Sequence, residues 1–397
     1  MNNFWRAIFI ACICMPIAAG CGLFLNKDPE EVYERALALV EAEKFPEAQI
    51  ELDKLKKLRP MTVLDHGLQA RINIAAGKSA DAIYELAAIP DDHPLAGWAR
   101  LRQGQLHRQR FEYRMAENDL KSAIQVDPGS VVARRELVFI LGLQLRRSEL
   151  SRLFLELSHM TTLSPKEVWV WCMVRDLVWW VPEEQIPMLQ KAIAADPGDH
   201  FSHLALVEVL KRNSKVDEAI ESLNELPADL PEALAKRLEI EIERNDTDKA
   251  AELFAKIPAD SSAAAEIRGR LALAEGKAKE AIQFFEMADQ ADPGRRQVLA
   301  DLGRAWMLAG DLEKGLDYAR RAARVDALNN LLLKSENSVE KSTPEDWLTF
   351  SRACEAAGRL DEARAWLALV IQANPLDSTA QAEIYRLDTL IRQKRSK

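Results

Sequence analysis

A pattern of small residues occurs twice at a fixed spacing between Ser262 and Ala327, and this spacing limits the folds open to the chain. In the first copy, Gly269 is followed by Ala281, Phe285, Ala288 and Pro293, and in the second, Gly303 is followed at the same offsets by Gly315, Ala319, Ala322 and Ala327. The period from Gly269 to Gly303 is typical of stacked helical hairpins. Because each hairpin buries its apolar face only against its neighbours, one array can extend along a long chain.

The composition agrees with a helical array and excludes one class of partner. Hydrophobic residues make up 48% of the 397 residues, while glycine (16) and proline (17) are scarce. Such a composition is typical of mostly helical proteins. The net charge of -9 argues against general nucleic-acid binding, which requires a basic surface, so we expect no nucleic-acid partner.

The pattern recurs along the chain with varying fidelity. Gly104, Ala116, Leu120, Ala123 and Pro128 repeat the offsets found at Gly269. The small residues mark places where helices cross closely, and the glycines Gly77, Gly276, Gly310 and Gly358 are expected at helix ends in the left-handed conformation. We predict a leader at 1–26, N-terminal repeats at 27–128, degenerate repeats with a Trp-rich unit at 129–260, two well-formed repeats at 261–327, an irregular insertion at 328–342, and a last repeat with a capping helix and basic tail at 343–397.

These positions resemble the tetratricopeptide repeat family, most specifically in 97–128, 262–327 and 343–375. The resemblance implies an all-α fold, a right-handed α-solenoid of about nine to ten helical hairpins. It also implies a concave face, lined by the first helix of each hairpin, that binds a peptide or a protein. A different helical solenoid with similar hairpins is the alternative.

The leader predicts a membrane-targeting helix in front of the array. The uncharged run Ala7–Leu25 follows Arg6 and is long enough to cross a bilayer with the N-terminus inside. The run can equally be a cleaved signal peptide. Ala18-Ala19-Gly20 before Cys21 resembles the bacterial lipoprotein box, which implies a lipid on Cys21. These interpretations place the body of the protein in the cell envelope, on the exported side of a membrane; a buried apolar helix of a soluble protein is the plainer alternative.

Three arginines follow the small residue of the first helix in three repeats. The register of the family places Arg270, Arg304 and Arg352 on the concave face. Guanidinium groups at equivalent positions would form a ladder able to bind carboxylates in a forked geometry. This predicts a protein partner with an acidic segment or a free C-terminal carboxylate. The alternative is structural, with the arginine stems covering the groove wall.

Tryptophans form the second candidate contact surface. Four of them fall within twelve residues, and one helix cannot hide all four on one stripe. Trp169 lies where the family places a core aromatic, whereas Trp171, Trp179 and Trp180 are candidates for contact with a protein or a membrane interface. The register also places Trp98 on the concave face. The alternative is a thickened core that packs against the degenerate repeat before it.

Nothing in the sequence frames a reaction. The cysteines outside the leader, Cys172 and Cys354, are far apart and form neither a metal motif nor a disulfide framework. His200 and His203 are too few for a metal site, and Asp199 beside them is expected to cap a helix. We therefore expect no catalytic residue, metal or cofactor, and a non-catalytic scaffold or adaptor tethered to a membrane. The alternatives are an envelope enzyme and a membrane-surface binding protein built on the same solenoid.

Overall fold

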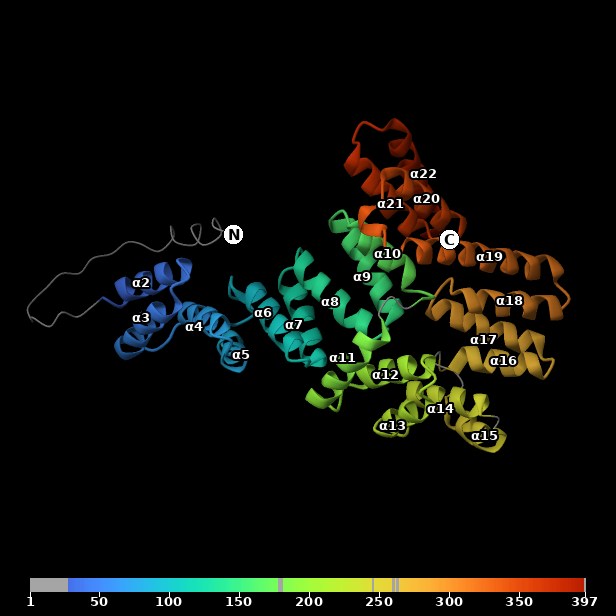
Figure 1. Ribbon diagram of the computed structural model, residues 1–397, viewed down its shortest axis with the longest axis horizontal. Helices are drawn as coiled ribbons and strands as arrows, with labels where there is room; N and C mark the ends of the chain where they lie inside the picture. The colour runs from blue at the N-terminus through green and yellow to red at the C-terminus, as the bar shows by residue number, and fades with distance from the viewer. Residues whose placement is uncertain (1–27, 178–180, 245, 259–260, 262–263, 396–397) are drawn as a thin grey trace, which may run out of the picture. The chain divides into compact units, whose positions relative to one another are not determined.

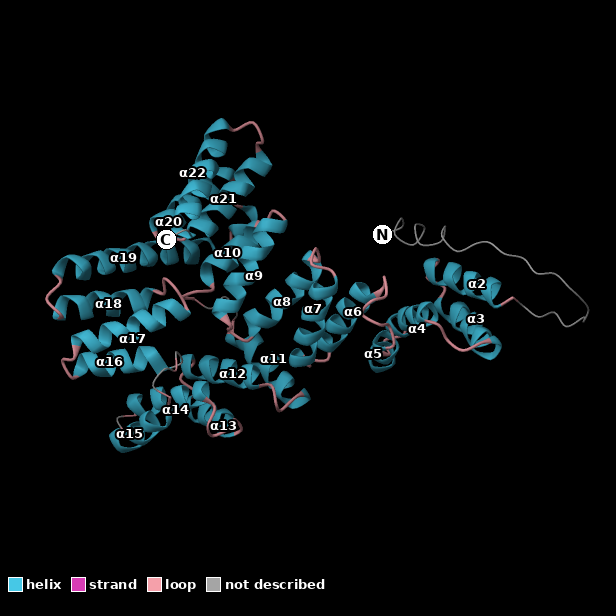
Figure 2. Cartoon of the chain, turned by 180° about the vertical axis from the view of Figure 1, so that it is seen from behind, coloured by secondary structure: helices cyan, strands magenta, loops and turns pink. Residues whose placement is uncertain are grey.

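The computed structural model describes residues 28–177, 181–244, 246–258, 261 and 264–395, and every element within these ranges is a helix (Figure 2). The predicted leader with Cys21, and the candidates Trp179 and Trp180, lie outside the described residues. No helix of the described ranges combines the length and the apolar character needed to span a bilayer.

The chain divides into two compact units, at the boundary between Glu85 and Leu86. The first contains three helices and most of a fourth: α2 (Pro29–Glu41), α3 (Phe45–Leu58), α4 (Val63–Ala75) and α5 (Ser79–Ala87). Asp28 caps α2, as the sequence predicts, by accepting a hydrogen bond from the backbone N–H of Glu30 at 3.1 Å. A core centred on Val32, Leu52 and Leu68 holds this unit together.

The second unit continues the same helix pairs. Its helices are α6 (Ala96–Gln109), α7 (Tyr113–Val126), α8 (Val131–Leu143), α9 (Arg147–Met160), α10 (Pro165–Met173), α11 (Pro182–Ala195), α12 (His200–Arg212), α13 (Val216–Asn224), α14 (Pro231–Glu243), α15 (Thr247–Lys256), α16 (Ala265–Ala274), α17 (Ala278–Ala291), α18 (Arg296–Leu308), α19 (Leu312–Ser335), η3 (Val339–Lys341), α20 (Pro344–Ala356), α21 (Leu360–Ala373) and α22 (Ser378–Arg395). In the part of the chain that the structure describes, consecutive helices pack in pairs, such as α6 with α7, α16 with α17 and α18 with α19, and α22 follows the last pair.

One turn joins the two helices in most of these pairs. In the pair α16–α17, the N–H of Lys277 reaches back to the carbonyl of Ala272 at 2.8 Å, and Gly276 between them has φ +75°. This hydrogen bond spans six residues and is typical of the Schellman motif at a helix C-terminus. All four glycines predicted at such turns have positive φ. The same turn also forms around non-glycine residues, which the sequence did not predict: Glu43, Phe111, Leu145 and Ser214.

Small residues allow the two helices of a pair to cross closely. A Cβ at Gly303 of α18 would lie 3.1 Å from the backbone oxygen of Gly315 and 3.3 Å from the backbone nitrogen of Ala319, both in α19. At Gly269 of α16 a Cβ would lie 2.6 Å from the buried ring of Phe285. The predicted role of the small positions, close approach of the second helix, is therefore confirmed for these pairs.

The predicted irregular insertion at 328–342 is wrong for its first half, because α19 continues unbroken to Ser335. The first of the two well-formed repeats has Pro293 just after its second helix, whereas the second repeat has Ala327 at the equivalent position. A proline would have disfavoured the helical conformation of the residue before it. Val325, Leu328 and Leu332 then share one buried face, at helical spacing. The chain leaves the helix after Ser335 and forms the short η3.

The second unit also departs from a linear array, because α10 packs against helices that come much later in the chain. Trp169 of α10 donates its indole N–H to the carbonyl of Leu332 in α19 at 3.0 Å. Arg359, at the start of α21, donates to the carbonyl of Cys172 at 2.7 Å and to Asp176 at 2.6 Å. In Figure 1, α10 lies between α9 and the orange and red helices α19 and α21. We call this contact of α10 and residues 174–177 with α18 to α21 the closure.

Candidate partner-binding groove

A groove of about 760 Å³ lies on the first helices of three successive pairs, α12, α14 and α16. Arg147 at the start of α9, with Asp292 and Arg295 between α17 and α18, completes its wall. The hydroxyl of Ser148 joins the two ends of this wall by donating to the carbonyl of Ala291 at 3.1 Å. The position of the groove on first helices agrees with the concave face that the sequence resemblance implies.

The groove carries both signs of charge in equal number. Its basic residues are Arg147, Lys211, Arg212, Lys236, Arg270 and Arg295, and its acidic residues are Glu208, Glu232, Glu239, Glu243, Glu266 and Asp292. On α14, Lys236, Glu239 and Glu243 follow the spacing of one helix face. Arg270, one of the three predicted arginines, therefore belongs to a surface of mixed charge.

The turn register explains the mixture. In most of the pairs, the turn hydrogen bond is accepted by a carbonyl near the end of the first helix. Arg270 lies two residues before that carbonyl in its pair, and Arg304 and Arg352 each lie two residues before it in their own pairs. The corresponding residues of the pairs α12–α13 and α14–α15 are Glu208 and Glu239. The predicted arginine ladder is thus the C-terminal part of a longer ladder that begins with two glutamates.

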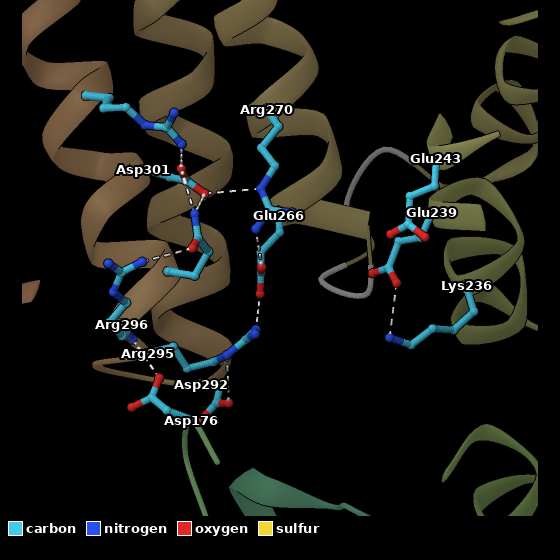
Figure 3. Close-up of polar contacts among 12 residues, drawn as sticks. Asp176, Lys236, Glu239, Glu243, Glu266, Arg270, Asp292, Arg295, Arg296 and Asp301 are labelled. Atoms are coloured by element: carbon cyan, nitrogen blue, oxygen red, sulfur yellow. Dashed lines mark hydrogen bonds and ion pairs between the residues drawn. The ribbon is translucent and has the colours of Figure 1, made fainter. Parts of the chain in front are cut away.

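The structure brings two of the three predicted arginines together around one carboxylate (Figure 3). Asp301, which is fully buried, accepts a hydrogen bond from Arg270 Nε at 3.1 Å and forms an ion pair with Arg304. Gln297 adds a third donor at 3.2 Å. Arg352 is exposed on α20 and makes none of the ion pairs found among the described residues. Of the three, Arg270 lines the groove.

Lysine residues hold the glutamates of the groove in their charged form. Lys236 Nζ lies 2.8 Å from Glu208 and 3.2 Å from Glu239, and Lys211 lies 3.0 Å from Glu239. Burial alone would raise the pKa of Glu239, but Lys236 and Lys211 outweigh it and the pKa is lowered. The pKa of Glu208 is lowered in the same way, against burial, by Lys236 and Arg212. These side chains form one connected network on the groove floor.

The opposite wall of the groove holds charges that are less well neutralised. Burial lowers the pKa of Arg147, and the nearby Arg212 lowers it further. Its Nη2 atom is buried without a hydrogen-bond partner among the described residues. Burial raises the pKa of Asp292 to about 6, although the positive charges of Arg175 and Arg147 act to lower it. Buried donors without a partner are costly, so this wall favours an incoming acceptor group.

Trp171 and Trp98, the predicted contact tryptophans that the structure describes, form no contact surface in the groove. Trp171 is buried, stacks on Phe154 with ring centroids 6.1 Å apart, and donates its indole N–H to Ser151 at 3.1 Å. Its predicted role in partner binding is therefore wrong, and it packs against the degenerate pair before it, as the structural alternative stated. Trp169, predicted to be a core aromatic, is buried. Trp98 is half-buried on α6 and does not line the groove.

The remaining predicted features are structural. Asp199 caps α12 by accepting the N–H of Ser202 at 3.3 Å, as predicted. Within the described ranges, His, Cys, Asp and Glu side chains form no group of three that could hold a metal ion. Two basic residues of the C-terminal helix pair with acidic residues of the chain: Arg386 with Glu355 at 2.6 Å and Arg395 with Asp361 at 3.1 Å.

Sequence reasoning missed most of the groove, although part of it was accessible. Reading the positions equivalent to Arg270 in the two preceding pairs would have found Glu208 and Glu239. The contributions of Arg147, Asp292 and Arg295 had no local signal, because α9 and the α17–α18 junction are far apart in the sequence.

Comparison with known proteins bears on the repeats. Two profiles of the tetratricopeptide repeat match residues 241–296 and 272–330. No curated protein matches the chain.

Solved structures give weaker likenesses. A tetratricopeptide repeat protein from Parabacteroides merdae is 14% identical, with a TM-score of 0.34, over 70% of this chain and 98% of that one. The APC/C hetero-tetramer Cut9–Hcn1 is 12% identical, with a TM-score of 0.33, over 90% and 76%. The human IFIT1 dimer with PPP-AAAA is 15% identical, with a TM-score of 0.32, over 93% and 92%. These likenesses are too distant to bear on function, but the profile matches show that residues 241–330 are tetratricopeptide repeats.

Proposed function

We propose that this protein is a non-catalytic scaffold that binds a segment of a partner protein in the groove of α12, α14 and α16. The observation that carries the proposal is the groove itself, about 760 Å³ in volume and lined by first helices of the repeats. Apolar side chains such as Ile242, which is 36% exposed, lie beside its charges. A concave surface of this kind suits an extended or helical segment, held by apolar contacts and oriented by polar ones.

The charges of the groove favour a partner segment with a carboxylate. The Arg147 Nη2 atom is buried without an acceptor among the described residues, and Arg295 beside it has its pKa lowered by burial and then by Arg147. A carboxylate placed between these two guanidinium groups would satisfy the open donor and reduce the repulsion of like charges. The carboxylate can belong to an acidic side chain or to the C-terminus of the partner.

The position of the groove can be tested by photo-crosslinking in the native cell envelope. A photoreactive residue at Ile242 is expected to capture a discrete partner. The matched control is Leu312, a large exposed residue on α19 outside the groove, 62% exposed. Capture of the same partner with equal yield from both positions, or capture from Leu312 alone, would contradict the proposed groove.

The charge preference can be tested on the captured partner. Arg147→Glu is expected to weaken binding about 10-fold or more, because it replaces the unpartnered guanidinium donor with a negative charge that repels the partner's carboxylate. Arg320→Glu is the matched control, since its side chain is 66% exposed on α19. An unchanged affinity for the folded Arg147→Glu variant would refute the carboxylate while leaving the groove in place.

We also propose that the leader tethers the protein to a membrane on the exported side. The support is in the sequence: the apolar run Ala7–Leu25 and the small residues before Cys21. Mass analysis of the mature N-terminus separates the three forms of the tether. A diacylated Cys21 indicates a lipoprotein, an intact Met1 indicates an anchor helix, and a free N-terminus after the run indicates a cleaved signal. A full-length protein that remains in the aqueous fraction with Met1 intact would refute the tether.

A further inference from the structure

Two cysteines that are far apart in the sequence meet inside the closure. Cys172 lies on α10 and Cys354 on α20, 182 residues later. Their Sγ atoms are 3.6 Å apart, and both side chains are fully buried. The sequence contains no disulfide framework, because the two residues share no local motif.

The two sulfur atoms lie close to bonding distance. A disulfide has an S–S length of about 2.05 Å, so the sulfur atoms need to approach by about 1.5 Å. The surrounding contacts hold the two helices in place for this approach. Arg359, five residues after Cys354, donates to the carbonyl of Cys172 at 2.7 Å and pairs with Asp176 at 2.6 Å.

We propose that Cys172 and Cys354 form an intramolecular disulfide that locks the closure under oxidising conditions. The bond would tie α10 to α20 directly, whereas the present contacts are hydrogen bonds, ion pairs and side-chain packing. Because the groove wall is completed where α9 meets the α17–α18 junction, a locked closure also fixes the two ends of the groove relative to each other.

The oxidant is a disulfide, either a small one such as oxidised glutathione or the active-site disulfide of a thiol oxidoreductase. The first cysteine thiolate attacks the donor disulfide, forms a mixed disulfide and releases one donor sulfur as a thiol. The second cysteine thiolate then attacks the mixed disulfide at the sulfur of the first cysteine and releases the second donor thiol. Two electrons pass from the cysteine sulfurs to the donor, and the two protons from the cysteines end on the released thiols.

The closed structure protects the thiols from this reaction. Burial and the neighbouring Cys172 raise the pKa of Cys354 above its ordinary value, which keeps the thiol protonated. The donor therefore reaches a cysteine when α10 separates from α20 and α21, or before they have packed during folding. Once formed, the disulfide closes a long loop of the chain and restricts the unfolded state.

The test uses the full chain with Cys12→Ser, Cys14→Ser and Cys21→Ser, so that Cys172 and Cys354 are the remaining thiols. The protein is incubated with mixtures of oxidised and reduced glutathione, quenched with acid, unfolded, alkylated and digested. We expect a crosslinked peptide pair containing Cys172 and Cys354, loss of both alkylation sites, and a rise in Tm of about 5–10 °C that a dithiol reductant reverses. Cys172→Ala and Cys354→Ala, each added to the same background, should show no rise.

The contrary results are equally specific. If both thiols remain free in the most oxidising mixture, in the folded protein and also after the unfolded chain has refolded in that mixture, the proposal is wrong. Glutathione adducts on each cysteine without the crosslinked pair would overturn it too, as would crosslinks found between different chains alone.

Discussion

The pairs α16–α19 and the closure around α10 are built on different rules. In α16–α19, each helix packs on the next one along the chain, and small residues such as Gly303 set the crossing. In the closure, Trp169 of α10 packs on α19 and Cys172 on α20, both of them distant in the sequence. The first rule leaves a period in the sequence. The second rule leaves no period in the sequence, because the partner of each residue then depends on which distant helix packs against it.

This difference has a thermodynamic consequence. In a linear array, stability is close to a sum over repeats and neighbouring interfaces, so the ends can unfold separately. A closed array couples its ends, since opening the closure exposes Trp169 and leaves the paired charges of Arg359 and Asp176 without each other. Substitutions in the two regions should therefore differ in which buried side chains become accessible to solvent, as well as in how much they lower the free energy of unfolding.

The largest effect is expected for Trp169→Ala in the closure. Removal of a fully buried indole should lower the free energy of unfolding by about 3–5 kcal/mol. Urea titration measures the loss. Phe285→Ala in α17 removes a buried ring from a regular pair and serves as the control. Both variants lose stability, but Trp169→Ala alone should accelerate alkylation of Cys354 in the native state. Equal acceleration in the two variants would remove the distinction between the regions.

Asp292 of the groove wall should make the stability of the second unit sensitive to pH. Burial raises its pKa to about 6, above the value near 3.9 of an unfolded aspartate. Its contribution to stability is therefore fully present below about pH 4 and is lost as the pH rises through 6, by about 2–3 kcal/mol. Asp119, whose pKa burial also raises to about 6, titrates in the same window.

Asp292→Asn should thus flatten the stability profile between pH 4 and 7 by roughly half. Unfolding in urea at each pH measures the profile. Asp317→Asn, an exposed substitution on α19, is the control and should leave it unchanged. A profile that keeps its full slope in Asp292→Asn would show that the carboxyl is not perturbed in this way.

Gly303→Ala tests the regular pairs. The added methyl group would lie 3.1 Å from a backbone oxygen of α19, and backbone cannot rotate away as a side chain can. We expect a loss of about 1–2 kcal/mol, after the higher helix propensity of alanine has offset part of the strain. Thermal and urea unfolding measure the loss. A stabilised variant would mean that α18 and α19 are further apart than described.

The smallest effect is expected at a turn. Ser214 has φ +60°, in a turn where other pairs have glycine. Ser214→Gly should raise stability by about 0.5–1 kcal/mol because glycine adopts this conformation without strain. The reverse change at an equivalent turn, Gly310→Ala, should lower stability by a similar amount, since space is open there and the backbone alone resists. Changes of the same sign in both variants would contradict a common turn.

The sequence was sufficient for the helix pairs and insufficient for the closure and the groove. The offsets from Gly269 predicted the small contacts, and the four turn glycines predicted the left-handed positions. The same turn at Glu43 or Phe111 was not predictable from residue type, because tertiary packing imposes a conformation that these residues disfavour. Ala327 in place of a proline signalled the longer α19, and the polar residues after it concealed the signal.

For the site, the repeat register predicted that Arg270 lies in the groove, but it did not predict which side chains Arg270 contacts. Asp301, three residues before Arg304, was visible in the sequence as its partner at helical spacing. That Asp301 also binds Arg270 depends on the packing of α16 against α18, which register does not specify. Trp171 was misplaced as a contact residue because its burial depends on Phe154 of the degenerate pair, whose position the weak repeat pattern did not determine.

The closure itself can be tested most directly by a double-mutant cycle on Arg359 and Asp176. Their side chains are 3% and 10% exposed and lie 2.6 Å apart, although 183 residues separate them. Urea unfolding of Arg359→Met, Asp176→Asn and the double variant gives the coupling energy, with Asp176→Asn plus Arg320→Met as the uncoupled control. A closed second unit predicts a coupling of about 2–3 kcal/mol. Additive effects, within about 0.5 kcal/mol, would mean that α10 and α21 do not meet in solution.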